Sequence, residues 1–369
     1  MAPSTASTAP LVFVIGGTGA QGIPVIQGLV KDDGYRVRFL TRDTNSRRSK
    51  QLLAFGNTEA LEGSFADEDI LRKGFHGADY AFVNIDGFNT GEKTEMFWAI
   101  RAYELALEEG IKFFVYGNLD YVYKKSGFDP KFRTGHYDGK GRIAEWILQQ
   151  NKDPSINKRM GAAIFTTGPY ISMVLAVGTP MSPKIEDGVV TWRMPLGDGA
   201  VAHVDLDDCG YYVRWLFDHQ SRANGLDLEV AIDLINYNDL AQAFERVTGH
   251  PAKFIDTSLD EYWTTGPMGT GAPPAGYNAD PKDSGTMSIR TNFTGFWNMW
   301  KYSGGNKGVI QRNFELLDEI HPNRIKSAEQ WFQREEEKSQ KQGTPSLWER
   351  ATNLRPVLKI AEDGRKGRL

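Results

Sequence analysis

The sequence predicts an α/β fold with a doubly wound parallel sheet and a smaller C-terminal α/β lobe. Short apolar runs alternate with longer helical patterns through the first half of the chain, which is typical of a parallel sheet covered by helices on both faces. The chain has 369 residues, more than one average domain of roughly 100 to 200 residues. Hydrophobic residues make up 40% and charged residues 24%, which excludes disordered, collagen-like and coiled-coil chains. We therefore expect a soluble globular protein with two domains, or with one domain and an added lobe.

Five apolar runs bounded by Gly, Asp or Asn have the length and composition of buried strands. They span residues 11–15, 36–40, 80–85, 112–117 and 162–167. Between them, residues 23–30 carry one apolar helical face, and residues 96–110 predict a second helix that ends at Gly110.

The second half of the chain is less regular. Residues 188–204 predict a short hairpin around residues 197–199. Residues 234–249 predict a helix with Asn236 or Asn238 as its N-cap.

Three further segments have distinct compositions. Residues 264–285 are rich in Gly and Pro, which indicates a long loop; a mobile connection and a functional lid are both open. Residues 333–343 carry a charged run that predicts a solvated face or a linker. Residues 346–360 predict a final helical piece.

Charge and cysteine content exclude several classes of function. The formal net charge is −4, so the chain has no overall electrostatic reason to bind nucleic acid or an anionic membrane. The single Cys209 cannot form an internal disulfide, and no zinc-binding spacing is present. We expect no metal, no direct nucleic-acid partner, and a reducing compartment.

The N-terminus carries no targeting pattern. Residues 1–10 are small and polar and are expected to be flexible, without a basic segment ahead of an apolar one. No apolar run approaches the ~18 residues of a membrane span. We therefore expect no membrane association and a cytoplasmic location, with the nucleus as an alternative.

The strongest motif is the glycine-rich run GGTGAQG at residues 16–22. Gly16 permits a tight turn, Gly19 lets the backbone approach a pyrophosphate, and Gly22 lets helix and strand pack closely. The N–H groups at the start of the following helix would bind the anion. Because a strand precedes the run and a helix follows it, the motif predicts a Rossmann-type dinucleotide site rather than a simple turn.

The end of the second strand bears on the choice of dinucleotide. An NAD site places an acidic residue there for the ribose 2′-hydroxyl, whereas a basic residue accommodates the 2′-phosphate of NADP. Here Arg42 occupies the strand end, and Asp43 lies one position later. We expect Arg42 to bind the 2′-phosphate and Asp43 to hold the arginines, although Asp43 leaves NAD open. A solvated helix face is the favoured interpretation for Arg47, Arg48 and Lys50.

Together these motifs resemble the NmrA-like branch of the short-chain dehydrogenase superfamily. The resemblance rests on residues 16–22, TRDTNS (41–46), FHGADYAFVNI (75–85), HYDGKG (136–141) and PLGDGAVAHVDLDDCG (195–210). NFTGFWNMWK (292–301) and LLDEIHPNRIKSAEQWF (316–332) are similar to its fungal members.

The resemblance implies a Rossmann domain over residues 11–170 with an NADP(H) site. It also implies a substrate lobe over residues 171–332, with the chain crossing back to the sheet, and an extension over residues 333–369. By position, the implied cofactor-binding residues are Gly16, Gly17, Thr18, Gly19, Ala20, Gln21, Gly22, Arg42, Asp43, Thr44, Asn45, Ser46, Gly63, Ser64, Asn84, Ile85, Asp86, Lys140, Thr167, Gly168, Pro169 and Tyr170.

The catalytic residues of the superfamily are only partly present. Typical members use a Ser, a Tyr and a Lys, the last two spaced as YxxxK, which puts both side chains on one helix face. In this chain His136 precedes Lys140 by four residues, and Tyr137 lies one place off this register. The strand end that usually presents the serine reads Gly117-Asn118. The standard triad is absent.

Three residues remain as catalytic candidates: Lys140, His136 and Tyr137. Lys140 would bind the nicotinamide ribose. His136 has an ordinary pKa of about 6.5, which suits proton delivery, although a capping or surface histidine is equally open. Nearby glycines at 135, 139 and 141 weaken the helix that this spacing requires.

Other polar and aromatic groups have structural interpretations. Asp205, Asp207 and Asp208 are expected to cap a helix or close a hairpin rather than bind a metal, and His203 and His321 are expected to be structural. A final group of four aromatic residues has helical spacing, which indicates core packing or the wall of an apolar pocket. Its members are Phe293, Phe296, Trp297 and Trp300.

Two functions fit the sequence. The first is an NADP(H)-dependent oxidoreductase acting on a small organic substrate such as an enone, imine or carbonyl. The second is a non-catalytic NADP(H)/NAD redox sensor that regulates transcription through a protein partner, which requires different affinities for two states. The missing Ser and Tyr favour the sensor, whereas the apparently complete cofactor site and large second lobe favour the enzyme.

Overall fold

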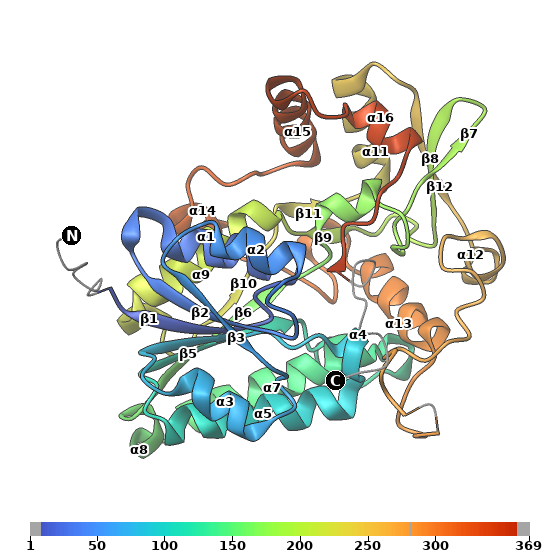
Figure 1. Ribbon diagram of the computed structural model, residues 1–369. Coiled ribbons are helices and arrows are strands. Elements are labelled where there is room, and N and C mark those ends of the chain that lie inside the picture. The colour runs from blue at the N-terminus through green and yellow to red at the C-terminus, as the bar shows by residue number, and fades with distance from the viewer. Residues whose placement is uncertain (1–8, 281, 360–369) are drawn as a thin grey trace.

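A seven-stranded parallel sheet forms the centre of the molecule in a computed structural model that describes residues 9–280 and 282–359 (Figure 1). Its strand order is β10-β6-β5-β4-β1-β2-β3, and every neighbouring pair is parallel. The strands are β1 (Leu11–Ile15), β2 (Arg36–Thr41), β3 (Thr58–Glu62), β4 (Tyr80–Val83), β5 (Phe113–Leu119), β6 (Gly161–Thr167) and β10 (Asp227–Glu229). All five apolar runs are strands of this sheet, so the predicted fold class is confirmed.

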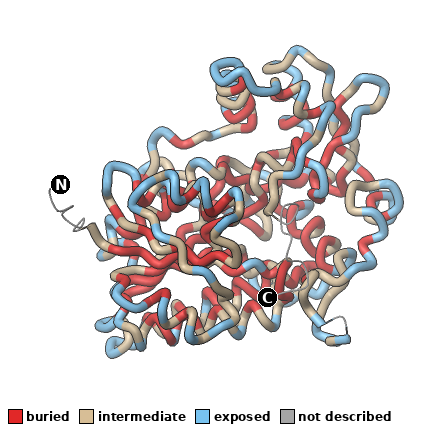
Figure 2. Tube along the Cα trace, in the orientation of Figure 1, coloured by how far each residue is buried: buried red, intermediate tan, exposed pale blue. Residues whose placement is uncertain are grey.

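Helices cover both faces of the sheet, as the alternation predicts. One face carries α1 (Gly22–Val30), α2 (Arg47–Leu53), α9 (Leu206–Asp218) and α14 (Phe314–Ile320), and the other carries α3 (Glu68–Phe75), α5 (Glu92–Glu108) and α7 (Gly135–Asn151). Side chains of β1 alternate between the two cores: Val12 and Val14 belong to the first, and Phe13 and Ile15 to the second. The sheet is therefore buried on both sides, as Figure 2 shows.

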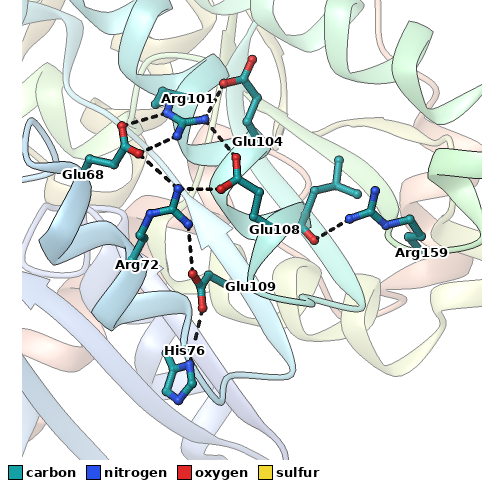
Figure 3. A network of polar contacts seen from close by, with 9 residues as sticks. Glu68, Arg72, His76, Arg101, Glu104, Glu108, Glu109 and Arg159 are labelled. Atoms are coloured by element: carbon teal, nitrogen blue, oxygen red, sulfur yellow. Dashed lines mark hydrogen bonds and ion pairs between the residues drawn. The ribbon is translucent and has the colours of Figure 1, made fainter.

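A network of ion pairs joins α3 to α5 on the outer surface (Figure 3). Arg101 contacts Glu68 at 2.6 Å and Glu104 at 2.9 Å, and Arg72 contacts Glu68 at 3.2 Å and Glu108 at 2.5 Å. Isolated exposed pairs contribute little to stability, and shared pairs in a network contribute more. The network holds α3 beside α5 at a distance from the carboxyl ends of the strands.

The second lobe has its own hydrophobic core. It contains a three-stranded sheet of β7 (Lys184–Glu186), β8 (Val189–Met194) and β12 (Ala252–Asp256), together with α11 (Tyr237–Thr248), α12 (Leu259–Thr265) and α13 (Ile289–Lys301). Helix α11 begins after Asn236, whose side chain accepts a hydrogen bond from the Asn238 backbone. This resolves the choice between the two predicted N-caps.

The predicted hairpin over residues 188–204 is wrong. Strand β8 pairs with β7 and β12, whereas β9 (Val201–His203) pairs with β11 (Asp233–Ile235). Between β8 and β9 the chain is held by other elements, because the Gly197 N–H donates to Asp256 and the Ala200 N–H donates to Trp300 O. Each strand therefore finds a partner distant in sequence.

The charged run at 333–343 is not a linker. It lies largely within α15 (Ala328–Gln342), whose buried residues, including Trp331 and Phe332, pack against α11. The following helix is shorter than predicted: α16 spans Leu347–Thr352 and has a capping box at Ser346 and Glu349. It stops before Pro356, because the residue before a proline disfavours helical backbone.

The predicted loop over residues 264–285 overlaps the last two residues of α12, and its described residues from 266 onward contain no helix or strand. It is docked on the Rossmann domain: the N–H groups of Tyr277 and Asn278 donate to the carbonyls of Phe88 and Asn89 at 2.9 and 2.8 Å. Across the described ranges, no helix is long and apolar enough to span a membrane. Residues 1–8 lie outside the described residues, as do residues 360–369, the last ten of the predicted C-terminal extension.

Candidate dinucleotide and substrate site

A cavity of about 530 Å³ lies at the carboxyl ends of the central strands. This is where ligands bind in open parallel sheets, at the point where the strand order reverses. Most of the predicted cofactor residues line it: Gly16, Thr18, Gly19, Ala20, Gln21, Gly22, Arg42, Gly63, Asn84, Ile85, Asp86, Lys140, Thr167, Gly168, Pro169 and Tyr170. The fold therefore brings together residues separated by more than 150 positions in sequence.

The glycine-rich turn has the shape that a pyrophosphate requires. Gly16 has φ +84°, and a Cβ there would lie 2.3 Å from Asn84 O. A Cβ on Gly22 would lie 2.2 Å from Gly16 O, whereas Gly19 lines the cavity itself. Helix α1 starts at Gly22 and has no side-chain cap, so its first turn is suited to an anion. The residues present fit a dinucleotide phosphate.

The residues predicted to bind the 2′-phosphate follow β2, and only one of them lines the cavity. Arg42 lines the cavity, and Asp43, Thr44, Asn45 and Ser46 do not. The Asp43 carboxylate accepts a hydrogen bond from Asn45 N at 2.8 Å, and Ser46 caps α2. These residues shape the loop after β2.

Gly17, Ser64 and Arg48 lie in or near the glycine-rich turn and the strand ends without lining the cavity. A Cβ at Gly17 would meet Ile26 and Phe39, and Ser64 accepts a hydrogen bond from Ala66 N. Arg48 is buried and donates to Thr18 O at 3.4 Å. The solvated face predicted for Arg48 is therefore wrong, because its side chain folds under the glycine turn.

Lys140 reaches the cavity from α7 and is held by the protein's own acceptors. Its ammonium donates to Ile85 O at 2.7 Å, to Asn84 Oδ1 at 3.1 Å and to Gly117 O at 3.3 Å, and these three acceptors match the three N–H donors of an ammonium. The ammonium also forms an ion pair with Glu95 Oε1 at 2.9 Å. Glu95 is fully buried, and burial raises its pKa to about 7, opposed by the charge of Lys140.

A chain of amide hydrogen bonds connects this lysine to the glycine turn. Asn84 Nδ2 donates to Gln21 Oε1 at 2.6 Å, and Gln21 Nε2 donates to Thr167 Oγ1 at 3.3 Å. The chain ties the turn after β1 to the ends of β4 and β6. Lys140 therefore lines the cavity and, through its hydrogen bond to Asn84, also helps to hold the glycine-rich turn in place.

His136 lies in the first turn of α7, on the substrate-lobe side of the cavity. Its Nδ1 contacts the side-chain amide of Asn292, and its ring lies 4.5 Å from Phe88 and 5.4 Å from Phe293 between centroids. Burial lowers the pKa of His136 to about 4. The imidazole is uncharged at neutral pH, so the argument for proton delivery from its ordinary pKa does not hold.

Tyr137 also lines the cavity and is buried, and burial raises its pKa well above its usual value. Its hydroxyl is therefore protonated at neutral pH and can donate a hydrogen bond. The position of the superfamily serine is closed: a Cβ on Gly117 would lie 2.8 Å from Asn84 Cβ. Asn118 is buried and donates to Thr166 Oγ1 at 2.8 Å.

Beyond His136 the cavity is walled by apolar side chains, which we call the apolar chamber. Its walls come from α4 (Gly87–Thr90), the 264–285 loop, α13 and the segment after β6. The chamber consists of Phe88, Met173, Met268, Pro273, Pro274, Tyr277, Ile289, Phe293 and Phe296. Both interpretations of the aromatic cluster hold in part, because Phe293 and Phe296 line the chamber and Trp297 and Trp300 are fully buried in the core.

The remaining polar candidates lie elsewhere. His203 is buried with its ring nitrogens 3.2 Å from Pro169 O and 3.3 Å from the Tyr237 hydroxyl, and His321 contacts Asp208 at 3.0 Å. Asp205 occupies the N-cap position of α9 without a capping hydrogen bond and pairs with Arg334 instead. No group of three or more metal-ligating side chains occurs within residues 9–280 and 282–359.

Sequence reasoning missed several residues of the site. Glu95 stands in the first turn of α5, where nothing in the local pattern distinguishes it from a surface carboxylate. The loop residues of the chamber and the C-terminal Leu358 and Lys359 also line the cavity. The Gly- and Pro-rich composition of residues 264–285 was the available signal for the loop.

Comparisons with known proteins agree with this architecture. A model of the NmrA-like family matches residues 8–269. An NmrA-like family domain-containing oxidoreductase, lnaB of Aspergillus flavus, is 28% identical over 255 residues, which cover 66% of this chain and 75% of the relative. The related oxidoreductase hkm9 of Aspergillus hancockii is 26% identical, covering 67% of this chain and 75% of the relative.

Solved structures share the fold at low sequence identity. NmrA, a negative transcriptional regulator in complex with NADP, superposes with a TM-score of 0.67 at 14% identity, covering 92% of this chain and 99% of that chain. The triphenylmethane reductase of Citrobacter sp. complexed with NADP(H) gives a TM-score of 0.62 at 14% identity, covering 87% and 99%. With the family model spanning more than half of its residues, the chain belongs to the NmrA-like family.

Proposed function

We propose that this protein is an NADP(H)-dependent oxidoreductase that acts on a small, flat and largely apolar organic substrate. The observation that carries the proposal is the continuity of one cavity. The glycine-rich turn and Arg42 line one part of it, and the aromatic side chains of the apolar chamber line another. A polar, phosphate-binding part that continues into an apolar part is the lining expected for a dinucleotide next to an apolar compound.

Different residues of the cavity would bind different parts of the dinucleotide. Gly16 to Gly22 and the start of α1 would hold the pyrophosphate, and Arg42 the 2′-phosphate. When bound, the nicotinamide would supply the hydride. The protein's own part is to bind and orient the reactants and to exclude water from the chamber.

In this proposal the Tyr137 hydroxyl donates the proton to the substrate. Tyr137 and His136 both line the cavity beside the chamber, and His136 is neutral near pH 7 because burial lowers its pKa to about 4. A neutral imidazole orients a substrate by a hydrogen bond. Lys140 keeps Asn84 and the carbonyl of Ile85 in place through the contacts described above.

The names of several relatives support an enzyme. The fungal relatives are named oxidoreductases. Among the structural neighbours, the Citrobacter protein is a triphenylmethane reductase and an Escherichia coli protein is an NADPH-dependent quinone oxidoreductase.

A second candidate is a dinucleotide sensor acting through a protein partner. Two observations favour it: a serine at Gly117 has no room beside Asn84, and the Lys140 ammonium is bound to Glu95 and backbone oxygen. NmrA itself is a negative transcriptional regulator. A sensor needs a conformational change on binding and no turnover.

An assay of NADPH oxidation distinguishes the oxidoreductase from the sensor. The purified protein is incubated with NADPH and a panel of quinones, enones, imines and triphenylmethane dyes, and NADPH oxidation is followed by absorbance. We expect oxidation above background with at least one flat aromatic compound, and a decrease of about tenfold or more in Tyr137→Phe. Tight NADPH binding without oxidation of any compound would instead support the sensor.

A further inference from the structure

The C-terminal segment after α16 returns to the dinucleotide cavity. Residues 353–359 leave the second lobe and run back toward the glycine-rich turn (Figure 1). The segment is anchored along its path, because Arg355 forms a parallel bridge with Ala176 and Arg355 O accepts a hydrogen bond from Val177 N at 3.3 Å. The path is therefore fixed by backbone contacts as well as by its side chains.

The tip of this segment forms part of the cavity wall. Leu358 and Lys359 line the cavity, and Lys359 Nζ donates to the Thr18 hydroxyl at 2.5 Å. Thr18 belongs to the turn that carries Gly16 and Gly19. A residue 341 positions away in sequence thus places a cation directly on the phosphate-binding turn.

The charge balance of the cavity indicates what this cation does. The ammonium of Lys140 is paired with the buried Glu95 at 2.9 Å. The α1 N-terminus supplies only partial positive charge. Full positive charge near the turn comes from Arg42 after β2, from Arg48 on α2, which donates to Thr18 O, and from Lys359 on the C-terminal segment, which donates to the Thr18 hydroxyl. Of these three side chains, Arg42 and Lys359 line the cavity.

We infer that the C-terminal segment is a strap across the bound dinucleotide, in which Lys359 forms a charge-assisted hydrogen bond to one of its phosphate groups. The inference rests on the proposed NADP(H) site and adds a residue and an element to it. Without nucleotide, the Thr18 hydroxyl accepts a hydrogen bond from the ammonium. With nucleotide, a phosphate oxygen takes this place, because hydrogen bonds between charged groups are the stronger ones.

Titration of NADPH and NADH into the full-length wild type, Lys359→Ala and Lys341→Ala tests the strap. Lys341 is an exposed lysine on α15 that pairs with Glu337, so its variant controls for the loss of one positive charge near the C-terminus. We expect Lys359→Ala to weaken NADPH binding about tenfold, the loss typical of one hydrogen bond to a charged group, and Lys341→Ala to leave it unchanged. The difference between wild type and Lys359→Ala should shrink at high ionic strength.

Comparison of the two nucleotides identifies the phosphate. An equal loss for NADPH and NADH assigns Lys359 to the pyrophosphate, and a loss for NADPH alone assigns it to the 2′-phosphate. Hydrogen exchange provides a second readout that needs no variant, because nucleotide binding should slow exchange of the backbone amides in residues 353–359.

Unchanged or tighter NADPH binding in Lys359→Ala, with no slowing of exchange, would overturn the strap while leaving the cofactor assignment intact. A wild-type protein that binds neither nucleotide would overturn the proposed function itself. The two failures are therefore distinguishable in one set of titrations.

Discussion

A single buried ion pair sets the electrostatics of the cavity floor. Lys140 and Glu95 lie 2.9 Å apart, and neither is exposed by more than a few per cent of its surface. Removing one partner of a buried pair leaves an unpaired charge away from water, which is strongly unfavourable. The register of HYDGKG predicts Lys140 in the site, and its partner comes from a helix whose sequence offers no corresponding signal.

Replacement of Glu95 by Gln tests this pair. The variant keeps the shape of the side chain and removes its charge, so we expect a loss on the order of 1 to 3 kcal/mol in the free energy of unfolding. Urea denaturation measures it. Glu104→Gln on the same helix is the control: Glu104 is exposed and pairs with Arg101 in the surface network of Figure 3, where a loss of about 1 kcal/mol or less is expected. Equal losses would contradict a special role for Glu95.

Arg42 is the residue expected to select the phosphorylated nucleotide. Because the 2′-phosphate is the only difference between NADPH and NADH, Arg42→Ala should weaken NADPH binding by about tenfold or more and leave NADH binding nearly unchanged. Parallel fluorescence titrations measure both. Lys50→Ala, an exposed charge on the neighbouring α2, should alter neither affinity. Comparable losses of NADPH and NADH in Arg42→Ala would refute the assignment.

Among the elements, α7 forms a regular helix although the glycines in its sequence predict a weak one. Three glycines in its first two turns should weaken a helix, yet α7 runs without interruption from Gly135 to Asn151. The glycines let it approach neighbouring segments closely: a Cβ on Gly141 would lie 2.3 Å from the Cβ of Tyr121. Tertiary packing therefore compensates for the low helix propensity and fixes the position of Lys140.

Gly141→Ala is therefore expected to destabilise the protein, although Gly to Ala in an unconstrained helix is stabilising by about 1 kcal/mol. The loss should reach about 1 to 3 kcal/mol because backbone or Cβ atoms of Tyr121 must move. Gly139→Ala is the comparison, since the tightest contact of its Cβ would be with the Glu92 side chain, at 3.0 Å, and its other contacts would lie at 3.8 Å or more. Thermal unfolding of both variants measures the difference. A stabilised Gly141→Ala variant would show that α7 is not packed in this way.

Elements with a strong local pattern were predictable, and their pairing was less so. The five apolar runs have strand periodicity of their own, and Asn236 is a capping residue at the start of an amphipathic helix. Strand β8 pairs with its sequence neighbour β7, but β12 and β11, the other partners of β8 and β9, lie about 30 to 65 residues away, and no local signal encodes such a contact. The charged run at 333–343 left a solvated face and a linker open, and it forms the solvated side of α15 because only the other side of that helix is buried.

For the molecule as a whole, two histidines link folding to pH: His203 is fully buried and His136 is partly buried. Burial lowers the pKa of His136 and His203 to about 4, below the ordinary value of about 6.5. The unfolded chain then binds more protons between about pH 6.5 and pH 4, so each histidine makes the folded state less stable as the pH falls through this interval. The raised pKa of Glu95, about 7, acts in the opposite direction.

The contribution of one histidine can be isolated by replacement. Between about pH 7 and pH 5, His203→Gln should lose less free energy of unfolding than the wild type, by on the order of 1 to 2 kcal/mol. Urea denaturation at several pH values gives this slope. His76→Gln, at an exposed position, should keep the wild-type slope. A His203→Gln slope equal to that of the wild type would mean that His203 is protonated in the folded state.

The candidate site was predictable only where one segment carries its own signature. The glycine-rich turn and Arg42 follow from the order of strand, turn, helix and strand, and Lys140 from a resemblance in register. The apolar chamber and Lys359 depend on where a long loop and the C-terminal segment fold back. These contacts arise from the packing of the second lobe, which single-sequence periodicity does not encode.

The proposed function and the strap both require that a phosphorylated dinucleotide binds at the glycine-rich turn. Isothermal titration of NADPH into the full-length protein, with NADH in a parallel experiment, measures this binding directly. We expect one saturable site per chain and tighter binding of NADPH than of NADH. Absence of binding heat and of any thermal stabilisation with both nucleotides would contradict this expectation.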